Sequence, residues 1–257
     1  MINALRDGMR RVDGAPAILF GLYLLTVGLS EALETAGRGV DPSGPVDVAG
    51  ASEFLMWLFL GGGILDRYAR DRPTRSYGFF GASGLFFFRF LRLALVLGIG
   101  YALVIRARQW FPSEGSAFWI AGAPLVVLQL IGEYAAVCSV VEDRRSMISA
   151  ISAAVRFIVA NAGAVILIFA GTYLMSLAVN SILPLYLRQP GVGAWSLFIA
   201  TQLASLAHLW VRLVGLASGV SLFQSKLAHA GYVARTQPAW PESPAAEAIT
   251  AAGRSRR

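Results

Sequence analysis

Long apolar stretches recur along this 257-residue chain, and each is about as long as a bilayer is thick. A transmembrane helix needs roughly 20 mostly apolar residues, because it rises about 1.5 Å per residue through a hydrocarbon core of about 30 Å. The stretches that meet this requirement are residues 16–33, 46–65, 85–105, 118–141, 163–187 and 195–220. The sequence therefore predicts an all-α, polytopic membrane helix bundle of about six transmembrane helices. Glu53 makes the second of these stretches the weakest.

The composition supports this class of protein. The chain is 56% hydrophobic and 14% charged, whereas a soluble domain carries about 25% charged residues. The net charge of +7 comes almost wholly from arginine, which in a membrane protein holds helix ends at the cytoplasmic surface, so no nucleic-acid partner is expected. The single cysteine, Cys138, and the two histidines, His208 and His229, exclude an internal disulfide and zinc-ligand spacing, so no metal or cofactor is expected.

The first stretch is open to a second interpretation as a signal peptide. Arg6, Arg10 and Arg11 would form its basic region and residues 17–29 its apolar region. The polar segment that follows, residues 30–34, offers no convincing small-residue cleavage site. We therefore expect an uncleaved transmembrane helix.

The distribution of basic residues predicts the orientation. With the N-terminus inside, the cytoplasmic segments hold fourteen basic residues and the outer loops hold four. The positive-inside rule then places both termini in the cytoplasm. Residues 1–235 are predicted to form the transmembrane domain, and the tail of residues 236–257, rich in proline, alanine and charge, is predicted to be disordered and cytoplasmic.

Two further segments are predicted beside the spans. Residues 146–161 place apolar side chains on one helical face and Ser149, Ser152 and Arg156 on the other, which is typical of an amphipathic helix at the membrane interface. Residues 73–93 are crowded with phenylalanine and are expected to enter the membrane obliquely before the third span. The glycine run at 61–63 lacks the lysine and the serine or threonine of a phosphate-binding loop, so it indicates close helix packing or a flexible helix end.

Ionisable residues at membrane depth are the candidate binding residues. From the rise per residue, Arg92 lies roughly 10 Å and Glu133 and Arg212 roughly 12 Å from the cytoplasmic ends of their spans. Three charges from three helices are therefore predicted to form one buried polar cluster. Arg89 and His208 are secondary candidates, since His208 is one helical turn from Arg212.

This cluster admits two interpretations. A salt bridge that locks three helices together is the favoured one, because buried ion pairs are often structural. The alternative is a polar pocket, open to the cytoplasm, that binds an anion or relays a proton. Anionic lipid headgroups are the expected partners of a cytoplasmic set of arginines, which comprises Arg67, Arg70, Arg144, Arg145 and Arg156.

Several stretches resemble a group of bacterial multi-pass inner-membrane proteins with a VVEDRRSM-type motif. They are LFLGGGILDRYARDRPT, FFFRFLRLALV, EYAAVCSVVEDRRSM and SLFQSKLAHAGY. The chain is more distantly similar to the membrane domain fused to some glycerophosphodiester phosphodiesterases, but it lacks their soluble catalytic domain. The resemblance implies a helix bundle in the bacterial inner membrane and no reaction. Relatives favour a basic residue at the position of Ala136, and its loss here weakens a ligand site built on that residue and Glu133.

Two functions follow as expectations. The first is a non-enzymatic structural, accessory or assembly factor, with a membrane-protein partner or a second copy of the chain as its partner. The second is a small transporter that uses Arg92, Glu133 and Arg212 for an anionic substrate or for proton coupling. No serine–histidine–acid set lies at one level, so no enzymatic activity is expected.

Overall fold

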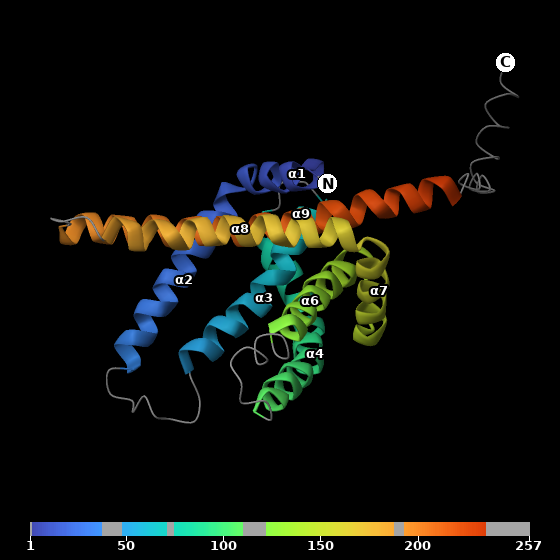
Figure 1. The fold of residues 1–257 in the computed structure, drawn as a ribbon, viewed down its shortest axis with the longest axis horizontal. Coiled ribbons are helices and arrows are strands. Elements are labelled where there is room, and N and C mark those ends of the chain that lie inside the picture. Colours follow the sequence, from blue (N-terminus) through green and yellow to red (C-terminus); the bar gives the residue numbers. More distant parts are fainter. Residues whose placement is uncertain (1, 38–47, 71–74, 110–121, 188–192, 235–257) are drawn as a thin grey trace, which may run out of the picture. The chain divides into compact units, whose positions relative to one another are not determined.

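The computed structural model describes residues 2–37, 48–70, 75–109, 122–187 and 193–234 (Figure 1). These residues form α-helices, and no strand occurs among them. The helices are α1 (Ile2–Asp13), α2 (Pro16–Gly37), α3 (Val48–Arg70), α4 (Ser76–Arg108), α6 (Ala123–Val141), α7 (Met147–Ala160), α8 (Ala162–Leu187) and α9 (Ala194–Ala234). The prediction of an all-α membrane bundle is confirmed. The predicted tail, residues 236–257, lies outside the described residues.

Four of the described helices, α4, α6, α8 and α9, are long and apolar enough to cross a membrane. They coincide with the last four predicted spans. The bent pair of α1 and α2 brings the number to five. Most of the predicted span 46–65 forms a helix, α3, which is not among these candidates. The described residues therefore contain four or five helices of this kind.

The basic N-terminal segment forms a helix of its own, α1, which the sequence interpretation did not foresee. Ala4, Gly8 and Val12 form its buried face, and a bend of 72° separates it from α2. The guanidinium of Arg11 donates a hydrogen bond to the carbonyl of Tyr68 at the end of α3. These contacts make α1 a packed amphipathic helix.

The phenylalanine-rich stretch is the first half of α4, not a separate oblique segment. Between Ser76 and Arg108 no proline interrupts the backbone, so the helix runs unbroken through the predicted boundary. Its rings pack on one another and on α3, as in the edge-to-face contact between Phe87 and Phe59 at 6.0 Å. The aromatic residues therefore form an interface between the two helices.

Helix α7 confirms the predicted helix at residues 146–161, but its apolar side chains do not share one face. Met147, Ala150 and Ala154 are buried in the protein, whereas Ile148 and Val159 are 77% and 74% exposed. A helix that is apolar on both sides suits a position between protein and lipid.

The glycine run at 61–63 brings α3 and α4 into close contact, as predicted. A Cβ atom on Gly62 would lie 2.7 Å from the Cβ of Phe86. A Cβ atom on Gly63 would lie 2.5 Å from Ser83 Oγ and 2.8 Å from the carbonyl oxygen of Phe79. Only glycine permits this approach of the two backbones.

Helix α9 contacts α1, α7 and α8. A Cβ on Gly8 of α1 would overlap Ser218 of α9, at 2.2 Å from its Oγ. Phe223 of α9 contacts Phe157 of α7 with ring centroids 4.9 Å apart, and Gly215 lies against Thr172 of α8. Most residues from Leu209 to Phe223 are buried, so this part of α9 belongs to the core of the bundle.

The substitution Gly63→Ala is expected to destabilise the protein by about 1–3 kcal/mol, because the added methyl group meets backbone of α4 that cannot rotate away. Cys138 is the only cysteine and is fully buried, so its reaction with a thiol-reactive fluorophore during heating in detergent reports unfolding.

Gly84→Ala on α4 is the matched control, since nothing lies within 4 Å of a Cβ at that position. It should leave the melting temperature unchanged or raise it, as alanine has the higher helix propensity. Equal effects of the two substitutions would contradict the close contact.

Candidate functional site

A cavity of about 1200 Å³ lies among the helices of the bundle. Residues of α2, α3, α4, α6, α8 and α9 line it. Most of the lining is apolar, but ionisable side chains also face it, and they are Glu31, Glu53, Glu133, His208 and Arg212. We call this the charged cavity. It brings together residues that are distant in sequence.

Arg212 faces the charged cavity from α9. Its neighbours Val211 and Leu213 are buried, whereas Arg212 itself is accessible, because the cavity opens beside it. The guanidinium carbon lies 3.6 Å from the ring centroid of Trp57 on α3, which is a cation–π contact. The Nε1 atom of Trp57 is buried without a hydrogen-bond partner. The arginine is thus held by an aromatic face rather than by a carboxylate.

Glu133 faces the same cavity from α6. Its Oε1 accepts a hydrogen bond of 3.0 Å from Nε2 of Gln129, one helical turn earlier. Glu133 and Glu53 are both near enough to Arg212 to attract it electrostatically. The ion pairs formed by the described residues do not include one between Glu133 and Arg212. The two charges therefore share a space without being locked together.

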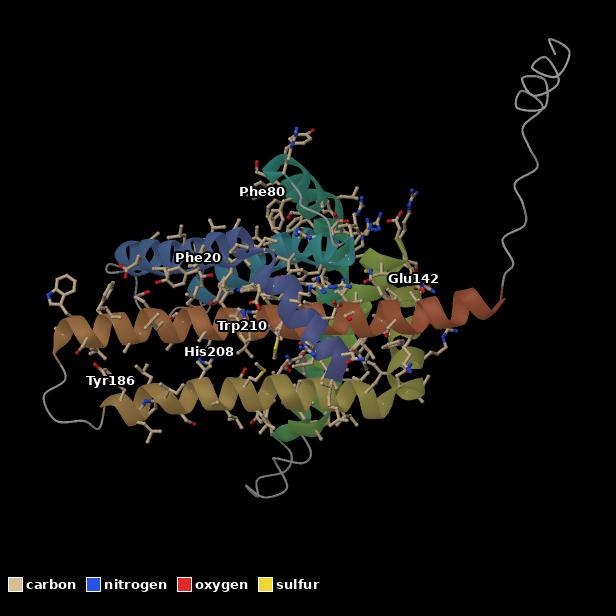
Figure 2. The ribbon with its side chains drawn as sticks, turned by 90° about the horizontal axis from the view of Figure 1, so that it is seen from above. Phe20, Phe80, Glu142, Tyr186, His208 and Trp210 are labelled. Carbon is tan, nitrogen blue, oxygen red and sulfur yellow. The ribbon has the colours of Figure 1, made fainter. Side chains whose placement is uncertain are left out.

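The predicted three-charge cluster is only partly assembled. Glu133 and Arg212 line the cavity, and His208, which is labelled in Figure 2, lines it as well. Arg92 does not: it is exposed on α4, on the side away from the lining residues Phe90 and Leu93. The rise per residue gives the height of a side chain in a helix but not its direction, and the direction was not resolved in the sequence argument.

Arg89, the other secondary candidate, belongs to a different site. Its NH1 forms an ion pair of 2.6 Å with Oδ1 of Asp143, which follows α6. Asp143 has a φ of 49°, in the left-handed region that aspartate tolerates better than most residues. The hydrogen bond from Arg89 is the main cause that lowers the pKa of Asp143 below its usual value of 3.8.

The rest of the EDRR segment completes a turn between α6 and α7, which we call the α6–α7 corner (residues 142–146). Arg144 donates hydrogen bonds to Glu142 and, at 2.6 Å, to Ser149 Oγ. The Ser146 hydroxyl caps α7 by accepting from the Ser149 backbone. The predicted end of the fourth span at Val141 is confirmed.

The arginines predicted to contact headgroups fall into two groups. Arg70 pairs with Asp66 of the same helix at 2.8 Å, and Arg144 bonds within the corner, so both have partners in the protein. Arg145 and Arg156 are exposed at the corner and on α7, and Arg67 is half-buried on α3. Exposed arginines at this end of the helices suit contact with phosphate groups.

Sequence reasoning missed several residues of the charged cavity. Trp57 lies one helical turn after Glu53, a spacing that could have suggested a shared face. Gln202 of α9 accepts a hydrogen bond from the hydroxyl of Tyr23 on α2, and both line the cavity. No pattern in one sequence reveals such a pair between distant helices.

These features define an integral membrane helix bundle with a charged cavity between its helices. Among the described residues, no group of three or more His, Cys, Asp or Glu side chains could hold a metal ion. No family model, curated protein or solved structure matches the chain. Its function must therefore be argued from the cavity itself.

The α6–α7 corner predicts a pH dependence of stability. Because the pKa of Asp143 is lowered in the folded state, its stabilising effect is complete above its ordinary pKa of 3.8 and is lost as pH falls through the lowered value. Between about pH 5 and pH 3, the melting temperature of Asp143→Asn should therefore fall less than that of the unchanged protein.

Asp143→Gly separates the charge from the backbone. It also lacks the carboxylate, so it should show the same reduced pH dependence, but glycine is unstrained at positive φ. An acid dependence that is unchanged in both variants would contradict a role for the Arg89–Asp143 pair.

Proposed function

We propose that this chain is a non-enzymatic integral membrane protein that binds a small charged solute in the charged cavity, in the manner of a small transporter. One observation carries the proposal: Glu133 and Arg212, on different helices, line one cavity of about 1200 Å³ and are not joined in an ion pair. Charges that only tie helices together contact each other directly, whereas these leave room for a ligand between the helices.

The energetic argument supports the same conclusion. An ionisable side chain at the centre of a membrane helix costs about 2.5–3.5 kcal/mol on insertion scales, so such residues face partners or water-filled cavities. Glu133 keeps only Gln129 as a hydrogen-bond partner at one of its oxygens. Water or a solute in the cavity would complete the coordination of this carboxylate.

Orientation and location form part of the proposal. The excess of basic residues in the inner segments supports cytoplasmic termini, and the resemblance to bacterial proteins supports the inner membrane. Exposed Arg145 and Arg156 would then lie at the cytoplasmic surface, where each contact with anionic headgroups is worth about 1 kcal/mol.

Glu133→Gln is expected to abolish transport while leaving folding intact, because it removes the charge but keeps the side-chain shape. Reconstituted proteoliposomes on a solid-supported membrane would be challenged with inorganic phosphate, small carboxylates, amines and quaternary ammonium ions, and the transient current measured. At least one solute should give a current in the unchanged protein and none in the variant.

Arg92→Leu is the control for this measurement, since Arg92 lies outside the cavity and should keep the current. Arg212→Leu should lose it. A current that survives Glu133→Gln, or a folded protein that gives no current with any of these solutes, would contradict the transporter proposal.

A structural or accessory role is the second candidate, and a different observation favours it. Arg212 rests on Trp57 and Glu133 is bonded to Gln129, so both charges have partners within the protein. Residues partnered in this way can serve packing alone. The bundle would then act by holding another membrane protein or a second copy of itself.

Unfolding energetics distinguish the two candidates. If the cavity separates Glu133 from Arg212 for a ligand, the effects of Glu133→Gln and Arg212→Leu on stability should add within about 0.5 kcal/mol. The measurement is a double-mutant cycle on the detergent-solubilised protein, followed by the reactivity of Cys138. A double variant that regains the stability lost by each single one would show a structural bridge and favour the second candidate.

A further inference from the structure

We propose that the ligand of the charged cavity is an amphiphilic organic cation, such as a hydrophobic amine or quaternary ammonium ion. This inference rests on the proposed solute-binding function and specifies its substrate class. It differs from the transporter alternative considered from the sequence, in which the cluster served an anionic substrate or proton coupling. The three steps below concern the charge, the rings and the size of the cavity.

The charge of the lining favours a cation. Glu31, Glu53 and Glu133 contribute three carboxylates, and Arg212 contributes the one guanidinium among the described residues that line the cavity. The described residues that line the cavity thus have a formal excess of two negative charges, with histidine counted as neutral, although the whole chain carries +7. Three carboxylates of a basic protein therefore line the same cavity. A wall of low dielectric strengthens its attraction for a cation.

The expected arginine pair is absent from this space. Arg92 points away on α4, and the guanidinium of Arg212 is already stacked on Trp57 and attracted by Glu53 and Glu133. An anion would have to compete with these carboxylates for a single guanidinium. A cation would instead relieve the repulsion among the carboxylates.

Aromatic rings supply the second feature of a cation site. Seven aromatic side chains line the cavity, and they include Phe90 and Tyr101 of α4 and Tyr173 of α8. The faces of such rings attract cations, and several of them together recognise quaternary ammonium groups. The contact of Arg212 with Trp57 shows a ring of this cavity already holding a cation at 3.6 Å.

The size and the remaining lining select an amphiphile rather than an inorganic ion. At about 1200 Å³ the cavity exceeds the roughly 300–1,000 Å³ typical of ligand pockets, so it can hold a cation with several rings. Leu58, Leu97 and Leu216 are among the apolar residues that would contact the body of such a ligand. Glu133, bonded only through Oε1 to Gln129, is the carboxylate best placed to receive its charge.

The test uses two ions of the same shape and opposite charge, tetraphenylphosphonium and tetraphenylborate. Binding of each to the purified full-length chain in nanodiscs would be measured by equilibrium dialysis, with empty nanodiscs as the blank for partition into lipid. Tetraphenylphosphonium should bind saturably and at least tenfold more tightly than tetraphenylborate. Glu133→Gln should weaken it by about tenfold or more, which corresponds to about 1.4 kcal/mol.

Glu142→Gln is the matched control, because Glu142 lies in the α6–α7 corner outside the cavity and its loss should leave phosphonium affinity unchanged. Cys138 reactivity confirms that each variant is folded. A loss in Glu142→Gln as large as that in Glu133→Gln would overturn the assignment of the cation to the cavity.

The outcomes separate this inference from the proposed function. Preferential binding of tetraphenylborate that is lost in Arg212→Leu would overturn the cation inference and leave a solute-binding cavity in place. Binding of neither ion, with a transport current that still depends on Glu133, would also overturn the cation inference alone. Binding of neither ion together with no current for any solute would overturn both.

Discussion

The bundle depends on how one charge is accommodated in its best-packed helix. Arg212 stands in the half of α9 that forms the core, between buried Val211 and Leu213. A guanidinium there needs an electron-rich surface, and the ring of Trp57 on α3 provides it at 3.6 Å. Because an aromatic face makes this contact, the carboxylates of Glu53 and Glu133 attract the arginine electrostatically without forming an ion pair with it. The two carboxylates and the guanidinium therefore all line the charged cavity.

Much of the fold could be read from the sequence, because apolar length and arginine placement are local properties. The C-terminal end of α6, the helix after EDRR and the close packing at the glycine run all depend on short segments, and they lie where the sequence predicted them. The continuous α4 and the separate α1 were missed. Helix α4 was missed because no proline marks the boundary that the sequence interpretation placed at residue 85. Helix α1 was missed because the basic segment before the first predicted span was not interpreted as a helix.

The site was predictable in height but not in direction. Counting residues located Arg92, Glu133 and Arg212 at similar depths, and two of them meet at the cavity. Arg92 faces outward because the close contacts of α4 with the glycines of α3 fix the rotation of α4 about its axis. A count of residues along a helix gives depth and says nothing about this rotation. The partners Trp57 and Gln202 come from other helices, and single-sequence reasoning has no access to such long-range contacts.

The glycine contact between α3 and α4 has a mechanical consequence. With backbones this close at Gly62 and Gly63, neither helix can slide or roll without the other, so the pair behaves as one rigid wall of the cavity. Helix α8 faces the cavity from another side, through Phe169, Thr172 and Tyr173. The stiffness of the α3–α4 wall thus comes from two consecutive glycines, since within the run at 61–63 only Gly62 and Gly63 leave no room for a Cβ atom.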